Sequence, residues 1–200
     1  MLLARIISLV FHPLFMPSAG LLLLFNSGTY LEFLTFNQKK AIFLILLTGT
    51  AIMPLTIIPV LLFQRKISSI RMENSHERVL PLAITVIFYG FTWYLLNRLN
   101  APGLITVYSI TAGIAVLLCT VISMKWMISL HMTALGALSG MVLAISMRFN
   151  INLILYLSVI FLISGTAGWA RLSLKAHTPA QIYLGFGGGL ALAFFMMYYF

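Results

Sequence analysis

Seven long apolar runs, separated by short polar segments, constrain the fold of this chain more than any other feature. A helix needs about 20 predominantly apolar residues to cross the hydrocarbon core of a bilayer. The runs cover residues 3–26, 41–63, 80–97, 102–124, 126–147, 151–169 and 178–199. They are continuously apolar rather than alternating, which argues against a transmembrane β-barrel. The sequence therefore predicts an all-α, polytopic membrane helical bundle with six or seven transmembrane helices.

The apolar runs fill the chain, so we expect a single integral membrane domain over residues 1–200. Hydrophobic residues make up 62% of the sequence and charged residues only 8%, a composition that a soluble domain could not bury. His12, Pro13 and Pro17 interrupt the first run. We interpret it as a kinked membrane helix, with a re-entrant segment as the alternative, rather than as a cleaved signal peptide.

The charge of the chain is strongly positive. Twelve Lys and Arg face three Glu and no Asp, for a net charge of +9. This excess suits anionic ligands or lipid headgroups. The cations lie in separate short segments and form no continuous basic face, which disfavours nucleic acid as a partner. Cys119, the only cysteine, excludes an internal disulfide and disfavours a thiolate metal site.

If all seven runs cross the membrane, the side of each polar segment follows by counting. One face collects the N-terminus, 64–79, the region around Lys125 and 170–177. The other face collects 27–40, 98–101 and 148–150. Eight cations against four would put the first face in the cytoplasm. If Arg71, Arg78, Lys125 and Arg171 are present for chemistry, the remaining cations tie at four on each face. The count therefore leaves the sidedness open.

Three polar clusters fall on that first face. They are "RMENSHERVLP" at 71–81, "KWMISLH" at 125–131 and "RLSLKAHTPAQ" at 171–181. Together they hold three arginines, two lysines and three of the four histidines. Guanidinium groups bind two oxygens of a phosphate at once, and histidine serves as nucleophile or proton donor near neutral pH. The clusters therefore predict a site that binds and cleaves phosphate esters at a membrane surface.

The order and spacing of these clusters resemble the signature motifs of the type 2 phosphatidic acid phosphatase superfamily, the membrane lipid phosphatases related to vanadium haloperoxidases. In the first motif a basic residue is followed by six residues and then Arg-Pro. Arg71 and Arg78 keep this spacing, with the proline delayed to Pro81. The second motif is Pro-Ser-Gly-His, of which "ISLH" keeps Ser129 and His131.

The third cluster preserves the spacing of the third family motif, which is Ser-Arg, five residues, His, three residues and Asp. Arg171, His177 and Gln181 occupy the last three named positions, and Ala170 stands in place of the serine. The resemblance covers about 65–199, and the first two apolar runs look like a variable addition. It implies a site that faces outward from the bacterial cytoplasmic (inner) membrane.

The resemblance implies metal-independent hydrolysis of a lipid phosphate or pyrophosphate through a phosphohistidine on His177, with no metal or other cofactor. His131 would protonate the departing lipid alcohol, and Gln181 would stand where the family has an aspartate that orients the nucleophile. The phosphoryl oxygens would be held by Arg71, Arg78, Ser129 and Arg171. Membrane lipids would surround the protein, and its oligomeric state is not predicted.

The departures from the family pattern motivate a second hypothesis. Gln181 supplies no charge, and changing the orienting aspartate of a serine-protease triad to its amide costs roughly 10⁴ in rate. Glu73 or Glu77 would have to reach across to compensate, or these two glutamates only pair with nearby arginines. The alternative is therefore a catalytically weak or inactive protein that binds or transports a lipid phosphate on the same scaffold.

Structural interpretations compete with the functional ones. The sequence "TPAQ" after His177 predicts a helix N-cap and first turn, so His177 could merely precede a capped helix. His131 could make a structural hydrogen bond inside an apolar helix. We interpret His76 as an exposed side chain on a solvated loop and His12 as a structural contact at the proline kink.

The glycines near the C-terminus have a packing interpretation. "GFGGG" at 185–189 lacks the Gly-Lys-Ser/Thr ending of a phosphate-binding loop. Gly185 and Gly189 have the four-residue spacing of closely packed membrane helices, and so do Gly136 and Gly140. We therefore expect the helices that carry these two pairs to approach a neighbour closely.

Overall fold

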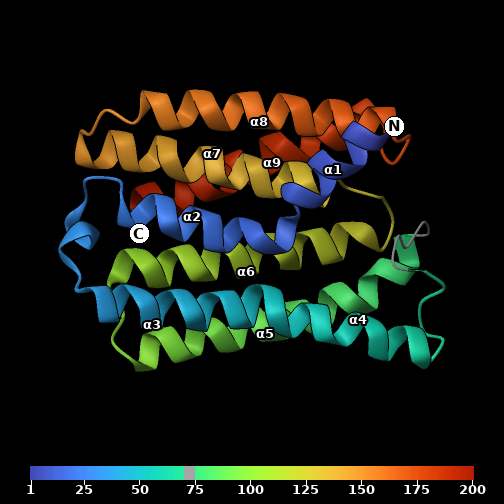
Figure 1. The fold of residues 1–200 in the computed structure, drawn as a ribbon, viewed down its shortest axis with the longest axis horizontal. Helices are drawn as coiled ribbons and strands as arrows, with labels where there is room; N and C mark the ends of the chain where they lie inside the picture. Colours follow the sequence, from blue (N-terminus) through green and yellow to red (C-terminus); the bar gives the residue numbers. More distant parts are fainter. Residues whose placement is uncertain (70–74) are drawn as a thin grey trace.

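The computed structural model describes residues 1–69 and 75–200, and within them every regular element is helical. Seven segments are long and apolar enough to cross a membrane, which confirms the predicted all-α polytopic bundle. They are Leu2–Phe25, Phe36–Phe63, His76–Arg98, Gly103–Ser123, Leu130–Phe149, Ile154–Ser173 and Pro179–Tyr199. The chain is thus a multi-pass membrane protein, with its helices lying side by side along one axis (Figure 1).

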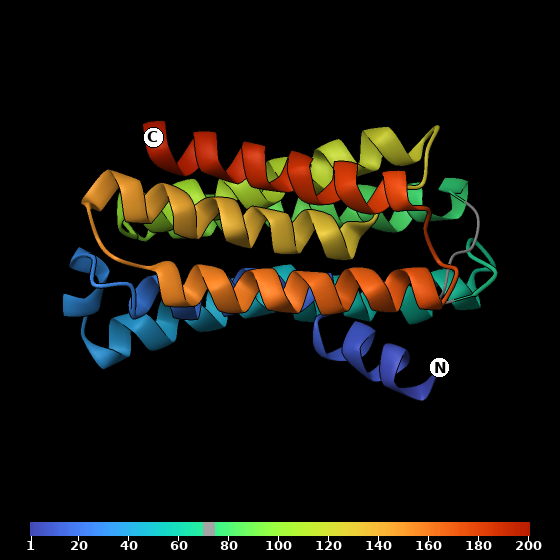
Figure 2. The ribbon, with the colours of Figure 1, turned by 90° about the horizontal axis from the view of Figure 1, so that it is seen from above.

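The first two spans are broken where the sequence places prolines. α1 (Leu2–Val10) and α2 (Met16–Phe25) are joined by a 3₁₀ turn at Pro13–Phe15. α3 (Phe36–Leu47) and α4 (Met53–Phe63) are joined by a π-helical turn. Proline lacks an N–H and clashes with the carbonyl four residues before it, which breaks or kinks a helix. α1 consequently turns out of the bundle (Figure 2) and contacts α8.

The other five spans are single helices. They are α5 (Ser75–Arg98), α6 (Gly103–Ser123), α7 (Leu130–Phe149), α8 (Ile154–Ser173) and α9 (Pro179–Tyr199). α7 is central: 61% of the residues in its most apolar stretch are buried, against 28–33% in the other spans. It packs most extensively on α9 and also contacts α8, while α5 pairs with α6.

Two spans begin earlier than their apolar runs predict. The second run starts at 41, but α3 begins at Phe36 behind a capping box formed by Thr35 and Gln38. The third run predicts a short span of 18 residues, whereas α5 extends back through Arg78 to Ser75. In both cases the first helical turns are polar, because they lie at the membrane surface, and an apolar count omits them.

The polar connections segregate as the counting predicts. The N-terminus, the α6–α7 connection and the α8–α9 connection lie at one end of the bundle (Figure 1). We call this the histidine end. The α2–α3, α5–α6 and α7–α8 connections and the C-terminus lie at the opposite end. Segments that are distant in the sequence are thereby brought to one membrane surface.

The α7–α9 contact is made backbone to backbone through glycines. A Cβ on Gly136 would overlap the carbonyl of Phe186, and one on Gly140 would overlap that of Leu190. A Cβ on Gly189 would overlap the carbonyl of Thr133. This confirms the predicted packing role, since small residues let membrane helices approach closely.

A matched pair of glycine substitutions tests this contact. Gly140→Ala places a methyl group against backbone that cannot give way, and overpacking typically costs about 1–3 kcal/mol. Gly188→Ala, on the exposed side of α9 where nothing lies within 4 Å, gains up to ~1 kcal/mol of helix propensity. Thermal unfolding in detergent should show a lower Tm for the first variant and an equal or higher Tm for the second. Equal shifts in both would contradict the packing role.

Candidate functional site

The α8–α9 connection places two of the predicted site residues on a tight reversal. α8 ends in a Schellman arrangement, with Lys175 in the left-handed conformation at φ 50°. The N–H of Lys175 donates to the carbonyl of Leu172 (2.9 Å) and that of Ala176 donates to the carbonyl of Arg171 (3.1 Å). Arg171 therefore occupies the last turn of α8, and His177 follows just past the turn.

A capping box at the start of α9 fixes the ring of His177. Oε1 of Gln181 accepts the backbone N–H of Thr178 (3.0 Å) and also lies 3.1 Å from Nδ1 of His177. Because a backbone N–H can only donate, the Gln181 atom is an acceptor and Nδ1 of His177 carries the proton. The neutral ring then presents the lone pair of Nε2, which is the form a nucleophile requires.

Burial and neighbouring charge keep His177 neutral. The side chain is 7% exposed, and its pKa is lowered from the usual 6.5 to about 4. Burial is the largest cause and the positive charges of Arg171 and Arg78 add to it, while hydrogen bonds to Gln181 and the backbone of Met127 oppose the shift. At neutral pH the ring is thus an uncharged base beside two guanidinium groups.

The start of α7 lies against the start of α9. Ser129, which caps α7, is fully buried, and its N–H donates to the carbonyl of Gln181 (3.4 Å). Among the described residues, neither Oγ of Ser129 nor buried Nε of Arg171 has a hydrogen-bond partner. Buried polar atoms are nearly always satisfied, and Arg171 lines the same cavity as His177, so its Nε can serve a ligand with acceptor oxygens.

The broken first span covers the second histidine of the site. Nε2 of His131, in the first turn of α7, donates to the carbonyl of Ser8 in α1 (3.0 Å). The ring of His12 packs edge-on against that of His131, with centroids 5.7 Å apart. Nδ1 of His12 accepts the N–H of Leu14 (3.4 Å). The hydrogen bond to Ser8 fixes the tautomer of neutral His131 and leaves Nδ1 as its acceptor nitrogen.

One cavity of about 1000 Å³ joins these groups. Its charged and titratable lining at the histidine end consists of Arg5, His12, Arg78, His131, Arg171, Lys175 and His177. The rest of the lining is mainly apolar and lies deeper between the helices. Cations and histidines from α1, α5, α7, α8 and the α8–α9 connection therefore face one cavity.

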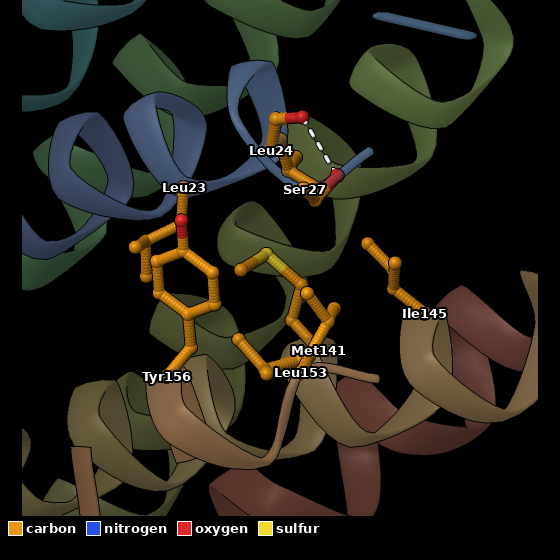
Figure 3. A pocket seen from close by; sticks show the side chains of 8 residues that line it. Leu23, Leu24, Ser27, Met141, Ile145, Leu153 and Tyr156 are labelled. Atoms are coloured by element: carbon orange, nitrogen blue, oxygen red, sulfur yellow. Dashed lines mark hydrogen bonds between the residues drawn. The ribbon is translucent and has the colours of Figure 1, made fainter. Parts of the chain in front are cut away.

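A second pocket differs in every respect. It lies between α2, α7 and the start of α8, and has a volume of about 10 Å³, room for about one water. Figure 3 shows its apolar side chains, with the hydroxyl of Ser27 hydrogen-bonded to the carbonyl of Leu24 (2.8 Å). With no charged group in its wall, it is a packing gap rather than a candidate site.

The structure unites most of the predicted site residues. Arg78, His131, Arg171 and His177 line one cavity. Gln181 and Ser129 contact this group from behind, through the hydrogen bonds described above. Arg71 and Glu73 lie outside the described residues.

Glu77 and His76 differ from their predicted settings. The Glu77 carboxylate accepts hydrogen bonds from the hydroxyl and N–H of Ser68 (2.9 and 3.3 Å), so the acceptor beside His177 is Gln181 rather than this glutamate. His76 is exposed, as predicted, but it belongs to the first turn of α5 rather than to a loop.

His12 and Ser8 are contributions to the site that the sequence analysis assigned elsewhere. His12 does mark the kink, as predicted, but it also lines the cavity and contacts His131. The available signal was its position in the first span, near the same membrane face as the three clusters. Ser8 contributes its backbone carbonyl, and a contact of this kind cannot be predicted from residue types.

Comparisons with known proteins leave the family of the chain open. No family model, curated protein or solved structure matches it. Among the described residues there is also no group of three or more His, Cys, Asp or Glu side chains placed to hold a metal ion. The structure by itself therefore defines a multi-pass helical membrane protein with a cavity that cations and histidines line at one end.

The lowered pKa of His177 predicts a pH-dependent stability. Above pH 6.5 the ring is neutral in both the folded and the unfolded chain, so it does not make the free energy of unfolding depend on pH. Between pH 6.5 and 4 the unfolded chain binds a proton that folded His177 does not, so the free energy of unfolding decreases as the pH is lowered. His177→Asn should reduce this fall, measured as Tm against pH in detergent. His76→Asn, at an exposed position, is the control, and a wild-type profile in His177→Asn would refute the assignment.

Proposed function

We propose that this protein is a metal-independent lipid phosphate phosphatase of the bacterial inner membrane, with its site at the outward face. The observation that carries the proposal is the neutral, buried His177 beside two guanidinium groups in one cavity at a membrane surface. Nε of Arg171, which has no hydrogen-bond partner among the described residues, adds a donor for a phosphoryl oxygen. The resemblance of the three clusters to type 2 phosphatidic acid phosphatases supports the same conclusion.

The reaction begins with attack of Nε2 of His177 on phosphorus. The bond from phosphorus to the lipid oxygen breaks as the nitrogen–phosphorus bond forms. His131, neutral before the substrate binds, takes a proton at Nδ1 from the bound phosphate monoanion and gives it to the departing alcohol. Water then attacks the phosphohistidine, His131 takes a proton from that water and passes it to the product, and inorganic phosphate leaves with both histidines neutral. Arg78 and Arg171 hold the phosphoryl oxygens, where charge builds up in both steps.

Gln181 orients the nucleophile without stabilising its charge. Its Oε1 holds the Nδ1 proton of His177, which aims Nε2 at the phosphate. A phosphohistidine also needs its ring charge compensated. Of the three glutamates in the chain, Glu77 binds Ser68, Glu32 lies at the opposite end of the bundle and Glu73 is outside the described residues. This favours, as the second candidate, a slow or inactive protein that binds or transports lipid phosphates.

Phosphate release distinguishes the two candidates. Purified wild type, His177→Ala and His76→Ala would be assayed with chelator on phosphatidic acid, phosphatidylglycerol phosphate and undecaprenyl pyrophosphate. We expect wild type and His76→Ala to release phosphate equally and His177→Ala to fall by at least about 10³, as for loss of a covalent nucleophile. Tight binding of these lipids with no release from any of them would establish the non-catalytic candidate.

Gln181→Glu tests the role of the missing charge. The change is isosteric, keeps the acceptor for His177 and Thr178, and adds a negative charge that favours a positively charged ring. We expect kcat to rise about tenfold or more. The upper limit is the factor of roughly 10⁴ in rate that the amide-for-carboxylate change costs in a protease triad. The lower limb of the pH–rate profile should also move to higher pH.

Two variants separate orientation from helix capping. Gln181→Met removes the acceptor for His177 and should lower kcat, whereas Thr178→Ala weakens the cap but keeps that acceptor and should mainly lower Tm.

If the Gln181→Glu variant is no faster than wild type and its pH–rate profile is unchanged, the orienting role of Gln181 is contradicted.

A further inference from the structure

The large cavity extends well beyond the histidine cluster. On α5 its lining recurs once per turn from Arg78 through Leu82 and Thr85 to Tyr89. This stripe spans 11 residues, about 16 Å at 1.5 Å per residue. The hydrocarbon core of a bilayer is about 30 Å thick, so the cavity reaches from the membrane surface to about the midplane.

The opposite walls carry small and apolar side chains. On α6 the lining runs along one face through Ala112, Ala115 and Cys119, and α7 contributes Ala134 and Ala137. Alanines on facing helices create width without adding polar groups. The deep part of the cavity is therefore an apolar chamber within the bundle, continuous with the cationic end.

Two buried tyrosines line the deep end of the chamber. Tyr89 is 3% exposed and Tyr108 is 7% exposed. The Tyr108 hydroxyl is held in place, because it donates to the carbonyl of Pro17 (2.9 Å) where α2 begins. The first span thus contributes to both ends of the cavity, through His12 at the surface and Pro17 at depth.

Such a chamber needs an apolar occupant. Protein interiors are close-packed, and apolar wall atoms that face a void lose their packing contacts on that side. Water is a poor filler, because each molecule needs two to four polar partners and the deep walls offer few. A hydrocarbon chain can pack against the apolar walls. Because the chamber is continuous with the cationic histidine cluster, the same molecule should carry an anionic head.

We propose that the chamber binds the hydrocarbon chain of the same lipid phosphate whose head occupies the histidine cluster. The assignment of the head rests on the proposed function. An extended chain advances about 1.2 Å per bond, as a polypeptide backbone does, so roughly 13 bonds span the chamber. The favoured ligand is a lipid phosphate whose first dozen or so chain carbons are unbranched or slender enough to lie between α5 and α6, inside the bundle rather than in the bilayer.

A photoreactive, non-hydrolysable ligand tests this directly. An alkylphosphonate with a diazirine about twelve carbons from phosphorus would be irradiated with the full chain in nanodiscs, and the labelled residues mapped by mass spectrometry. We expect labelling at Tyr89 and Tyr108, competed by inorganic phosphate or vanadate. Labelling confined to exposed positions such as Leu117 or Phe91, which face away from the protein interior, would overturn the proposal.

Matched variants test the space itself. Ala115→Trp fills the chamber and should reduce labelling of the tyrosines about tenfold, since a packed core admits no second occupant. Leu117→Trp adds the same ring on the exposed side of α6 and should leave labelling within about twofold of wild type. Ala137→Leu fills the chamber from α7 and provides the same test if Ala115→Trp does not fold. Undiminished labelling in a folded filling variant would refute the chamber.

Further outcomes distinguish this proposal from binding of a bulk lipid chain and from the proposed hydrolysis. A photoreactive alkyl alcohol that labels the tyrosines as strongly as the phosphonate would show a bulk lipid chain in the chamber and overturn the proposal. Labelling needs no turnover, so specific labelling without phosphate release from any lipid would support the chamber while the proposed hydrolysis fails. Phosphate release with labelling only outside the bundle would support the hydrolysis and refute the chamber.

Discussion

The contact between α7 and α9 determines the geometry of everything at the histidine end. Glycines at 136, 140 and 189 let the two backbones meet without intervening side chains, which fixes the axial register of the helices. With that register set, the first turn of α7 lies against the first turn of α9, and Ser129 donates to the Gln181 carbonyl. His131 and the His177–Gln181 pair are then carried by two helix starts that cannot slide past one another, the kind of rigid support that a site needs.

The electrostatics of the site follow from what surrounds this rigid support. Arg78 and Arg171 come from α5 and α8, and their charges act on His177 without a carboxylate at its Nδ1, where Gln181 stands instead. Burial, and after it these two charges, lower the pKa of His177 and keep the ring unprotonated. The proposed phosphate ligand would therefore meet a base that is already in its nucleophilic form.

Much of this arrangement could be predicted from the sequence, and the parts that could not have physical reasons. Continuous apolar runs have the length of membrane spans, so the bundle and the segregation of loops followed from counting. The spacing of Arg171, His177 and Gln181 was informative because a short helix–turn–helix leaves little conformational choice. The contact of His131 with the Ser8 carbonyl was inaccessible, since every residue has a carbonyl and only the kink at Pro13 aims this one. Polar first turns also hid the true start of α5.

The kinked first span changes how the site should be understood. In the comparison of motifs, residues before about 65 looked like a variable addition, yet α1 supplies the acceptor for His131 and α2 anchors the tyrosine at the deep end of the cavity. A straight helix could not do both, because the surface contact and the deep contact lie on different sides of the break at Pro13. The prolines that interrupt the span therefore let one segment close the cavity near the surface and line its floor. The site and the chamber are parts of one cavity, and the first span lines both of them.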